Sequence, residues 1–483
     1  MSLGPYTYRA IQIFNELRAF SFDSIYTQST NYIRSDKTRN SHYIWLAVML
    51  VEWSLTQDSR ACKKMQYIDF KRLMNRLIAL QNYTKGPLEC QTATAWLRRL
   101  SYQQFPYQHK PRKADIGRQF LLFSEGGPAQ KLGRIFSKTS GISIRDFSLL
   151  CFSAIVHALA EKEHSISSDW FRRLKDEVTA GAPEQFLHLL INTGPFKKPG
   201  HESDYYEQST LFSRPLIAHS KKRSGITYEY LHKSHISEAL RDFIYDHLKS
   251  EDANGFMGQF GEAFSRYIES LLSEAALQSF LSERELKNIP TFRASKVVDF
   301  VVYEPNASIL IEAKAIATTP TTRSTASAAT LGKRLRDSLL KAIDQARKTA
   351  INLSKESQRD FFLIIVTYKQ LYLATGPTIR DCISKEILTE LDTDHAETSL
   401  LPFENIFVFS IDELERLLAA MTAKKTTFAT FLTAVKKRQT DPKQMKFVIS
   451  QHLDIEEFFE FPVSLEKHVA NIFEELGTVL KGH

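Results

Sequence analysis

The sequence predicts a mostly helical N-terminal half followed by an α/β domain in which helices flank a mixed central sheet. Apolar residues recur at helical spacing through the first half, with little strand signal. A β-hairpin pattern then occupies 296–315, and two further apolar strand patterns alternate with helical patterns after it. We therefore expect a helical region over 1–200, the α/β domain over 201–425 and a helical extension over 426–483.

The hairpin is predicted by its apolar runs and by its turn. The segments 297–303 and 309–311 are rich in β-branched and aromatic residues, as strands commonly are. Between them, Pro305 fixes φ and Asn306 tolerates a left-handed backbone conformation, which suits a tight connection. The two runs are thus expected to pair with each other as antiparallel strands.

The register of this hairpin brings three charged side chains together. If Tyr303 pairs with Ser308 across a four-residue loop, Asp299 lies directly opposite Glu312. Side chains alternate along a strand, so Lys314 shares the face of Glu312, and Asp299 joins them. Directly opposed residues have Cβ atoms about 4.5–5.5 Å apart, where two like charges destabilise the pairing.

These charges interrupt strands that are otherwise nearly all apolar, a pattern typical of strands buried on both faces. Buried charges need partners or a metal ion. A divalent cation between Asp299 and Glu312 would remove their repulsion, and Mg²⁺ binds carboxylate oxygens, waters and substrate phosphates. The alternative is a hairpin with one solvated face on which three charges fall by chance.

The pair Val298-Asp299 followed by Glu312-Ala313-Lys314 resembles the motif of the PD-(D/E)XK nuclease superfamily, which has the restriction-endonuclease-like fold. Val298 stands where the family has proline. The resemblance implies that Asp299, Glu312 and the Ala313 carbonyl bind Mg²⁺, for which Mn²⁺ would substitute. It also implies that Lys314 positions or activates the attacking water.

The resemblance covers roughly 227–418 and further implies a carboxylate on a helix ahead of the first hairpin strand. Helical spacing over 255–272 predicts such a helix, and Glu262 lies one turn into it. Glu269 lies roughly on the same face, and an alternative alignment puts Ser265 at the family's position. Surface glutamates beside an apolar stripe are the competing interpretation.

A basic helix is predicted over 332–353, after a segment rich in Thr, Ser and Ala over 317–330. Related nucleases often carry Gln on this helix, so Gln345 is expected to orient Lys314 or a phosphate. The segment before it is interpreted as a mobile loop at the mouth of the site, with a phosphorylatable linker as the alternative. An ordinary solvated helix face is the alternative for the basic side. The expected phosphate contacts in this half are Arg293, Lys296, Lys333, Arg334 and Lys341.

Composition adds weak constraints. Of the 483 residues, 43% are hydrophobic and 24% charged, which is ordinary for a globular protein, and the net charge of +8 suits a polyanionic partner without requiring one. The four cysteines form no CxxC pair, so we expect free thiols in a reducing compartment. The first residues lack the pattern of a signal peptide, and the apolar run 44–55 is too short to span a bilayer, so a cytoplasmic protein without membrane contact is expected.

The N-terminal half predicts helices, one basic segment and a linker. Helices are expected at 10–20, 42–55, 69–81, 143–162, 168–178 and 184–191. The segment 96–113 interleaves cations with aromatic rings, which suits a nucleic-acid surface, with a solvated loop as the alternative. Gly, Pro and charged residues over 192–210 indicate a linker, where we place the main boundary. The cations of the basic segment are Arg98, Arg99, Lys110, Arg112 and Lys113.

Together these features favour a Mg²⁺-dependent endonuclease that cleaves DNA, with RNA as the alternative substrate. By analogy of fold and architecture, the chain resembles bacterial restriction or anti-phage defence effectors, whose helical part would recognise the substrate, a trigger, a partner protein or a second copy. Two other classes stay open. One is a nuclease-fold binding protein without activity, and the other is a helical scaffold whose hairpin charges are incidental.

Overall fold

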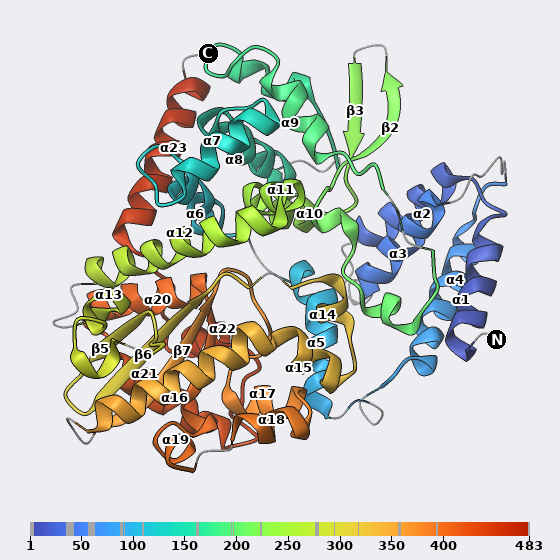
Figure 1. Cartoon of the computed structure of the whole chain (residues 1–483). Coiled ribbons are helices and arrows are strands. Elements are labelled where there is room, and N and C mark those ends of the chain that lie inside the picture. The colour runs from blue at the N-terminus through green and yellow to red at the C-terminus, as the bar shows by residue number, and fades with distance from the viewer. Residues whose placement is uncertain are drawn as a thin grey trace. The chain divides into compact units, whose positions relative to one another are not determined.

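The computed structural model divides the chain into two compact units (Figure 1). Unit 1 comprises 1–120, 134–247 and 471–483, and unit 2 comprises 121–133 and 248–470. The expected boundary near residue 200 and the separate extension from 426 both differ from this division. The described residues are 4–34, 43–56, 63–86, 90, 92–108, 111–160, 164–194, 196, 198–222, 225–275, 280–293, 295–316, 318–355, 359–392 and 395–481.

Unit 1 is mostly helical, as the sequence predicts, with one small sheet. Its elements are α1 (Pro5–Leu17), α2 (Phe22–Arg34), α3 (Ile44–Leu55), α4 (Tyr67–Leu80), η2 (Gln81–Tyr83), α5 (Ala93–Gln104), η3 (Phe105–Tyr107), α8 (Ile144–Ala160), β1 (Ser165–Ser167), η4 (Ser168–Leu174), α9 (Ala182–Leu190), η5 (Glu202–Tyr206), η6 (Thr210–Phe212), β2 (Ile217–Lys222), β3 (Gly225–Glu229) and α10 (Lys233–Arg241). Four helices include residues of both units: α6 (Lys113–Phe123), α7 (Gln130–Ser140), α11 (Phe243–Glu251) and α23 (Val463–Lys481).

The core of unit 1 follows from its apolar helices. The nearly uniformly apolar α3 is buried on most sides, and α4 buries the stripe that includes Phe70 and Leu77. Tyr205 and Tyr206 join the same core. The prediction of a linker over 192–210 is therefore wrong, because these aromatic rings draw that segment into the core despite its Gly, Pro and charged residues.

The small sheet of unit 1 has the strand order β1-β3-β2, with antiparallel pairs throughout. The strand β3, which contains Thr227, thus belongs to unit 1 and not to the α/β domain. The helical stretch over 233–251 is divided into two helices. It ends as α10 at Arg241 and resumes as α11 at Phe243, because Asp242 adopts a non-helical conformation between them.

Unit 2 is an α/β domain. Its elements are α12 (Ala253–Glu274), β4 (Phe280–Ser282), α13 (Glu283–Leu286), η7 (Pro290–Phe292), β5 (Phe300–Tyr303), β6 (Ala307–Lys314), α14 (Pro320–Ser324), α15 (Ala328–Leu335), η8 (Arg336–Leu340), α16 (Lys341–Ser354), β7 (Asp360–Thr367), α17 (Gly376–Cys382), α18 (Lys385–Leu391), α19 (His395–Leu400), η9 (Phe403–Asn405), β8 (Ile406–Ser410), α20 (Ile411–Thr422), α21 (Phe428–Gln439) and α22 (Ile449–Ile455).

The five-stranded sheet of unit 2 is mixed, as predicted, with the order β4-β5-β6-β7-β8. β4, β5 and β6 pair antiparallel, whereas β6, β7 and β8 pair parallel. In Figure 1, α16 lies in front of the sheet, where it contacts β6 and β7, and α20 lies behind it and contacts β7 and β8. The buried strands β7 and β8 match the two further strand patterns, and α20 starts with a capping box in which the Glu413 carboxylate accepts from the Ser410 amide.

The chain between β6 and α16 is more ordered than the sequence suggests. The segment expected to be a mobile loop contains the helix α14, in which Thr322 and Ser324 are buried, and the first turn of α15. Thr319 and Ser327 cap these two helices through their hydroxyls. The predicted helix over 332–353 therefore begins earlier, at Ala328, and it contains one π-helical turn, η8.

Among the described residues, no single helix combines the length and the apolar composition needed to cross a membrane, and only the bent pair α7 and α8 meets those criteria jointly. Cys90, Cys151 and Cys382 are free and buried, and Cys62 lies outside the described residues.

Candidate functional site

The hairpin of β5 and β6 has the predicted register. Tyr303 pairs with Ser308, and Phe300 pairs with Ile311. Continuing the ladder by one residue sets Asp299 opposite Glu312 at the start of β5. β6 is the central strand of the sheet, its residues from Ala307 to Glu312 are buried, and Glu312 is only 3% exposed.

Asp299, Glu312 and Lys314 converge on one point. The Glu312 carboxylate accepts from the Asp299 amide at 3.1 Å and from Lys314 Nζ at 2.5 Å. The Asp299 carboxylate accepts from the Ala313 amide at 2.7 Å through Oδ2. Each acid thus holds the backbone of the opposite strand, which fixes both side chains where the sequence predicts them.

Burial dominates the electrostatics of the two acids. The pKa of Glu312 is raised from 4.5 to about 7, mainly by burial and then by the neighbouring Asp299 charge, against the opposing effect of Lys314. Burial likewise raises the pKa of Asp299 from 3.8 to about 6, opposed by the hydrogen bond from Ala313 and by Lys314. The carboxylates of Asp299 and Glu312 therefore share the single ammonium of Lys314, so keeping both acids charged lowers the stability of the fold.

This donor set fits a hard divalent cation that is completed by other ligands. Asp299 Oδ1 accepts no hydrogen bond from the described part of the chain, so one oxygen of the pair is available. Among the described residues, no three His, Cys, Asp or Glu side chains gather to hold a metal on their own. A cation here would need main-chain, water or substrate oxygens as well, which is how Mg²⁺ is usually bound.

A third carboxylate near Asp299 is one that the sequence interpretation missed. β4 pairs with β5 so that Ser282 lies opposite Phe300, and the Glu283 amide donates to the Asp299 carbonyl at 2.6 Å. The Glu283 charge contributes to the raised pKa of Asp299, after burial. Glu283 is about half exposed and also binds Lys287 at 2.6 Å. A strand pattern at 280–282 that ends in a Ser-x-x-Glu capping box is the signal that could have located it.

The helix α12 does not supply the expected carboxylate. Its apolar stripe, which includes Phe260, Phe264 and Tyr267, is buried as predicted. Glu262 lies away from that stripe with its side chain 80% exposed, and its ion-pair partner is Arg266 at 4.0 Å. The backup Glu269 is exposed and Ser265 is half-buried, and no hydrogen bond or ion pair links Glu262, Glu269 or Ser265 to Asp299 or Glu312. The predicted role of Glu262 therefore finds no support in this geometry.

Gln345 lies close to the site but has a different partner from the expected one. Its side-chain amide donates to the Val297 carbonyl at 3.3 Å, and no contact joins it to Lys314. One turn further along α16, Thr349 Oγ1 accepts from the Val298 amide at 3.4 Å. Both contacts tie α16 to the two residues that precede Asp299, so Gln345 positions the strand.

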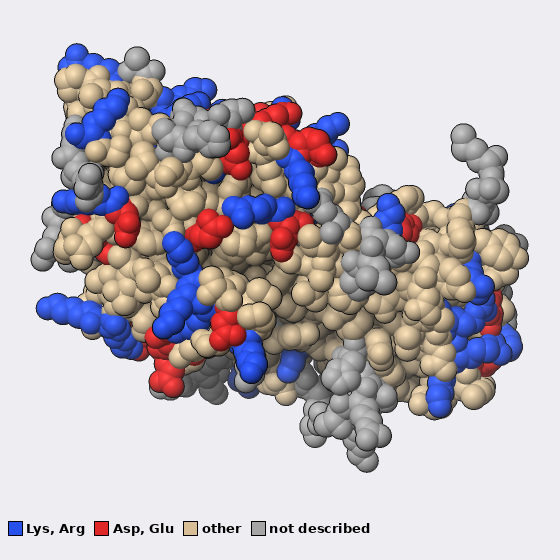
Figure 2. Space-filling model, turned by 90° about the horizontal axis from the view of Figure 1, so that it is seen from below, with Lys and Arg blue, Asp and Glu red and all other residues tan. Residues whose placement is uncertain are grey.

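The basic residues predicted in unit 2 are mostly at the surface. Arg293, Lys296, Lys333, Arg334 and Lys341 are all exposed. Figure 2 shows Lys and Arg in several separate groups on the face in view, many beside Asp or Glu, without one continuous positive surface. The five predicted cations are thus accessible to a polyanion.

The basic residues predicted in unit 1 are mostly structural. Arg98 and Arg99 are 1% and 0% exposed, so their prediction as nucleic-acid contacts is wrong. α5 extends through them and turns them inward, where Arg99 covers the Tyr206 ring at 3.9 Å. Arg112 binds Asp115 at 2.8 Å, and Lys113 is exposed beside the Phe473 ring. Lys110 lies outside the described residues.

Comparison with known proteins adds no assignment. No family model, curated protein or solved structure matches the chain. The resemblance to the nuclease superfamily therefore stays a prediction from the hairpin residues.

Proposed function

We propose that the chain is a Mg²⁺-dependent endonuclease that hydrolyses phosphodiester bonds in DNA. The observation that supports this most directly is the convergence of Asp299, Glu312 and Lys314 on one face of a buried hairpin. A structural role alone gives no reason to bury two acids against one lysine, because unbalanced buried charge is costly. A phosphodiester site has a use for the excess negative charge, since it attracts the cation that the reaction requires.

In this proposal the two acids bind the metal and Lys314 contacts the water or the phosphate. Asp299 and Glu312 would hold the cation, with Asp299 Oδ1 as the open oxygen and the Ala313 carbonyl as a further ligand. Bound Mg²⁺ supplies Lewis-acid polarisation of the phosphate and lowers the pKa of an attacking water. Lys314 has three N–H donors, and Glu312 takes one of them. The remaining donors can orient the water or neutralise charge that develops on a phosphate oxygen.

The third carboxylate in this proposal is Glu283 in place of Glu262. Glu283 adjoins Asp299 through the β4–β5 ladder and is exposed enough to meet solvent or a second cation. Glu283 would bind such a cation only after its ion pair with Lys287 breaks. A role in restriction or anti-phage defence remains a proposal from architecture alone.

The test compares isosteric variants on four substrates. We expect the wild-type protein to cleave plasmid or linear duplex DNA with Mg²⁺ or Mn²⁺ and to be inactive in EDTA. Asp299→Asn and Lys314→Met should each lower the rate by at least about 100-fold with folding retained. Glu262→Gln is the matched control, because that side chain is exposed and lies outside the cluster.

Single-stranded DNA and RNA of the same sequence complete the assay. Preferential cleavage of RNA would replace DNA as the substrate without changing the site. Wild-type rates for Asp299→Asn, or no metal-dependent cleavage of any substrate, would refute the proposed activity.

A further inference from the structure

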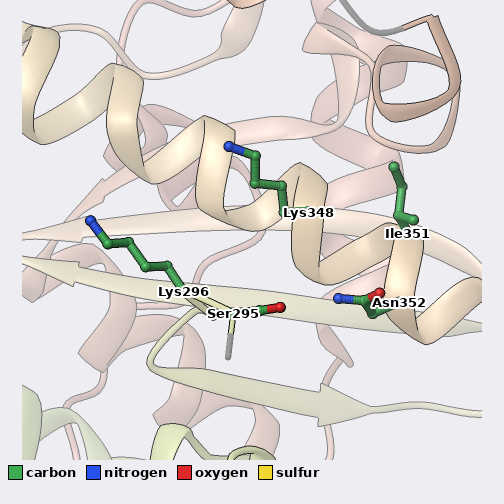
Figure 3. Close-up of a pocket in the computed structure, with 5 residues that line it drawn as sticks. All are labelled: Ser295, Lys296, Lys348, Ile351 and Asn352. Carbon is green, nitrogen blue, oxygen red and sulfur yellow. The ribbon is translucent and has the colours of Figure 1, made fainter. Parts of the chain in front are cut away.

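A small basic cavity lies beside the hairpin in unit 2. It has a volume of about 240 Å³ and is lined by Ser295, Lys296, Lys348, Ile351 and Asn352 (Figure 3). Ser295 and Lys296 come from the segment that leads into β5, and the other three come from one side of α16. In Figure 3 the Lys296 and Lys348 side chains extend in the same general direction from these two elements.

The two walls of the cavity are fixed to each other. Gln345 on α16 donates to the Val297 carbonyl, and the Val298 amide donates to Thr349. Val297 directly follows Lys296, and Thr349 directly follows Lys348. The two lysines are therefore each one residue from a cross-link, so the spacing of their backbones is set by the fold.

The lining offers hydrogen-bond donors and no acidic side chain. Lys348 binds Asp344 at 2.8 Å, but an ammonium has three donors and can serve an anion as well. Asn352 Oδ1 accepts from Lys355 at 3.2 Å, which leaves the amide nitrogen of Asn352 as its donor. Figure 3 shows that nitrogen on the side of Ser295. Figure 3 shows the two ammonium groups together on one side and the Asn352 amide and Ser295 hydroxyl on the other, so the lysines are the donors that would recognise a phosphate.

The cavity is also close to the acidic pair. Lys296 precedes Asp299 by three residues, so their Cα atoms are at most about 11 Å apart. Successive phosphates of one strand in a duplex advance about 3.4 Å along its axis. A phosphate in the cavity would thus lie within roughly three nucleotides of a phosphodiester held at Asp299.

We propose that this cavity binds a backbone phosphate that flanks the scissile phosphodiester and so sets the position of the strand on the enzyme. This rests on the proposed nuclease function for its ligand, although the binding itself needs no cleavage. Lys296 and Lys348 act as positioning residues, and Asp299, Glu312 and Lys314 remain the reacting group.

Binding is measured first, in EDTA, with a fluorescent duplex oligonucleotide and the full-length chain. Lys296→Gln and Lys348→Gln should each weaken binding by about 3- to 10-fold and lower the slope of log affinity against log salt by about one. Lys385→Gln, at the exposed start of α18, removes the same charge from the same unit and should change neither quantity. Wild-type affinity and slope in both cavity variants would overturn the inference.

A second arm separates the two sources of phosphate. Inorganic phosphate should compete with the oligonucleotide for the wild-type protein and compete less for Lys348→Gln. If phosphate binds the cavity while the variants leave oligonucleotide affinity unchanged, the ligand is the free anion and the inference is wrong. Because both arms omit metal, absence of cleavage would refute the proposed function without affecting this result.

Discussion

Replacing Glu312 with Gln should stabilise the protein at alkaline pH. The folded state raises the pKa of this carboxyl to about 7, above its ordinary value of 4.5, because burial disfavours the charged form. The folded state therefore binds more protons than the unfolded state between those values. Stability from this group is fully present below about pH 4.5 and is lost as pH rises through 7. Gln keeps the shape and one of the two acceptor oxygens but carries no charge to bury.

The size of the effect follows from the two pKa values. The rise of the Glu312 pKa from about 4.5 in the unfolded state to about 7 in the folded state lowers the free energy of unfolding. The loss is roughly 3 kcal/mol at pH 8 and under roughly 1 kcal/mol at pH 5. Asp299 titrates with Glu312, so its own raised pKa is not added separately. For a domain of this size, 1 kcal/mol moves Tm by about 2–4 °C. Glu312→Gln should therefore raise Tm by several degrees more at pH 8 than at pH 5.

Thermal unfolding in EDTA at pH 5, 6.5 and 8 measures this difference. Glu262→Gln serves as the control, since its side chain is 80% exposed and pays no comparable burial cost. Added Mn²⁺ should stabilise the wild-type protein at pH 8 and reduce the advantage of the variant. A Glu312→Gln gain that is equal at all three pH values, or a loss that grows with pH, would refute the burial argument.

Three further outcomes are expected. Mn²⁺ affinity measured by calorimetry should rise by up to about 100-fold from pH 5 to pH 8, because the metal competes with a proton for the Glu312 carboxyl, whose pKa is about 7. A pH-independent affinity would contradict this. Glu304→Gln should cost about 1 kcal/mol in urea unfolding, because the Glu304 carboxylate accepts from the Phe428 and Ala429 amides at the start of α21, and an unchanged midpoint would show that this cap contributes nothing. Arg99→Ala should destabilise unit 1 by about 3 kcal/mol, because the Arg99 guanidinium is buried against Tyr206 and the Lys85 carbonyl. The folded variant should keep its nucleic-acid affinity. Reduced affinity with unchanged stability would show that Arg99 is a binding residue.

The hairpin could be predicted from the sequence because its information is local. Two apolar runs and the Pro305-Asn306 turn determine which residues pair, and alternation then fixes the face of every side chain. The convergence of Asp299 with Glu312 follows from counting alone. The strands β7 and β8 can be predicted equally well, since each is a short, predominantly apolar run.

The neighbours of the hairpin could not be found in the same way. Whether Glu262 faces the sheet depends on the rotation of α12 about its axis, which the apolar stripe sets and which turns Glu262 toward solvent. Glu283 enters through the pairing of β4 with β5, a contact between segments separated by a turn and a short helix. Such placement depends on tertiary packing, which overrides local preference.

The predictions for the N-terminal half are wrong where they assume that a charged side chain must be exposed. The aromatic residues beside Arg98 and Arg99 in the sequence predict surface cations, but both side chains are buried. The same aromatic neighbours can shield a guanidinium, whose planar face stacks on a ring. Tyr205 and Tyr206 illustrate the converse, since two buried rings turned an apparently flexible segment into part of the core.

The π-helical turn η8 changes how α15 and α16 present their cations. In an uninterrupted α-helix, Arg334, Lys341 and Lys348 would follow one another at heptad spacing along a single stripe. One additional residue in the turn rotates all that follows by about 100° relative to α15. Refolding that turn as α-helix with its residue count unchanged would bring the three cations into line and turn Lys348 away from Ser295, exchanging a localised anion pocket for a continuous basic track.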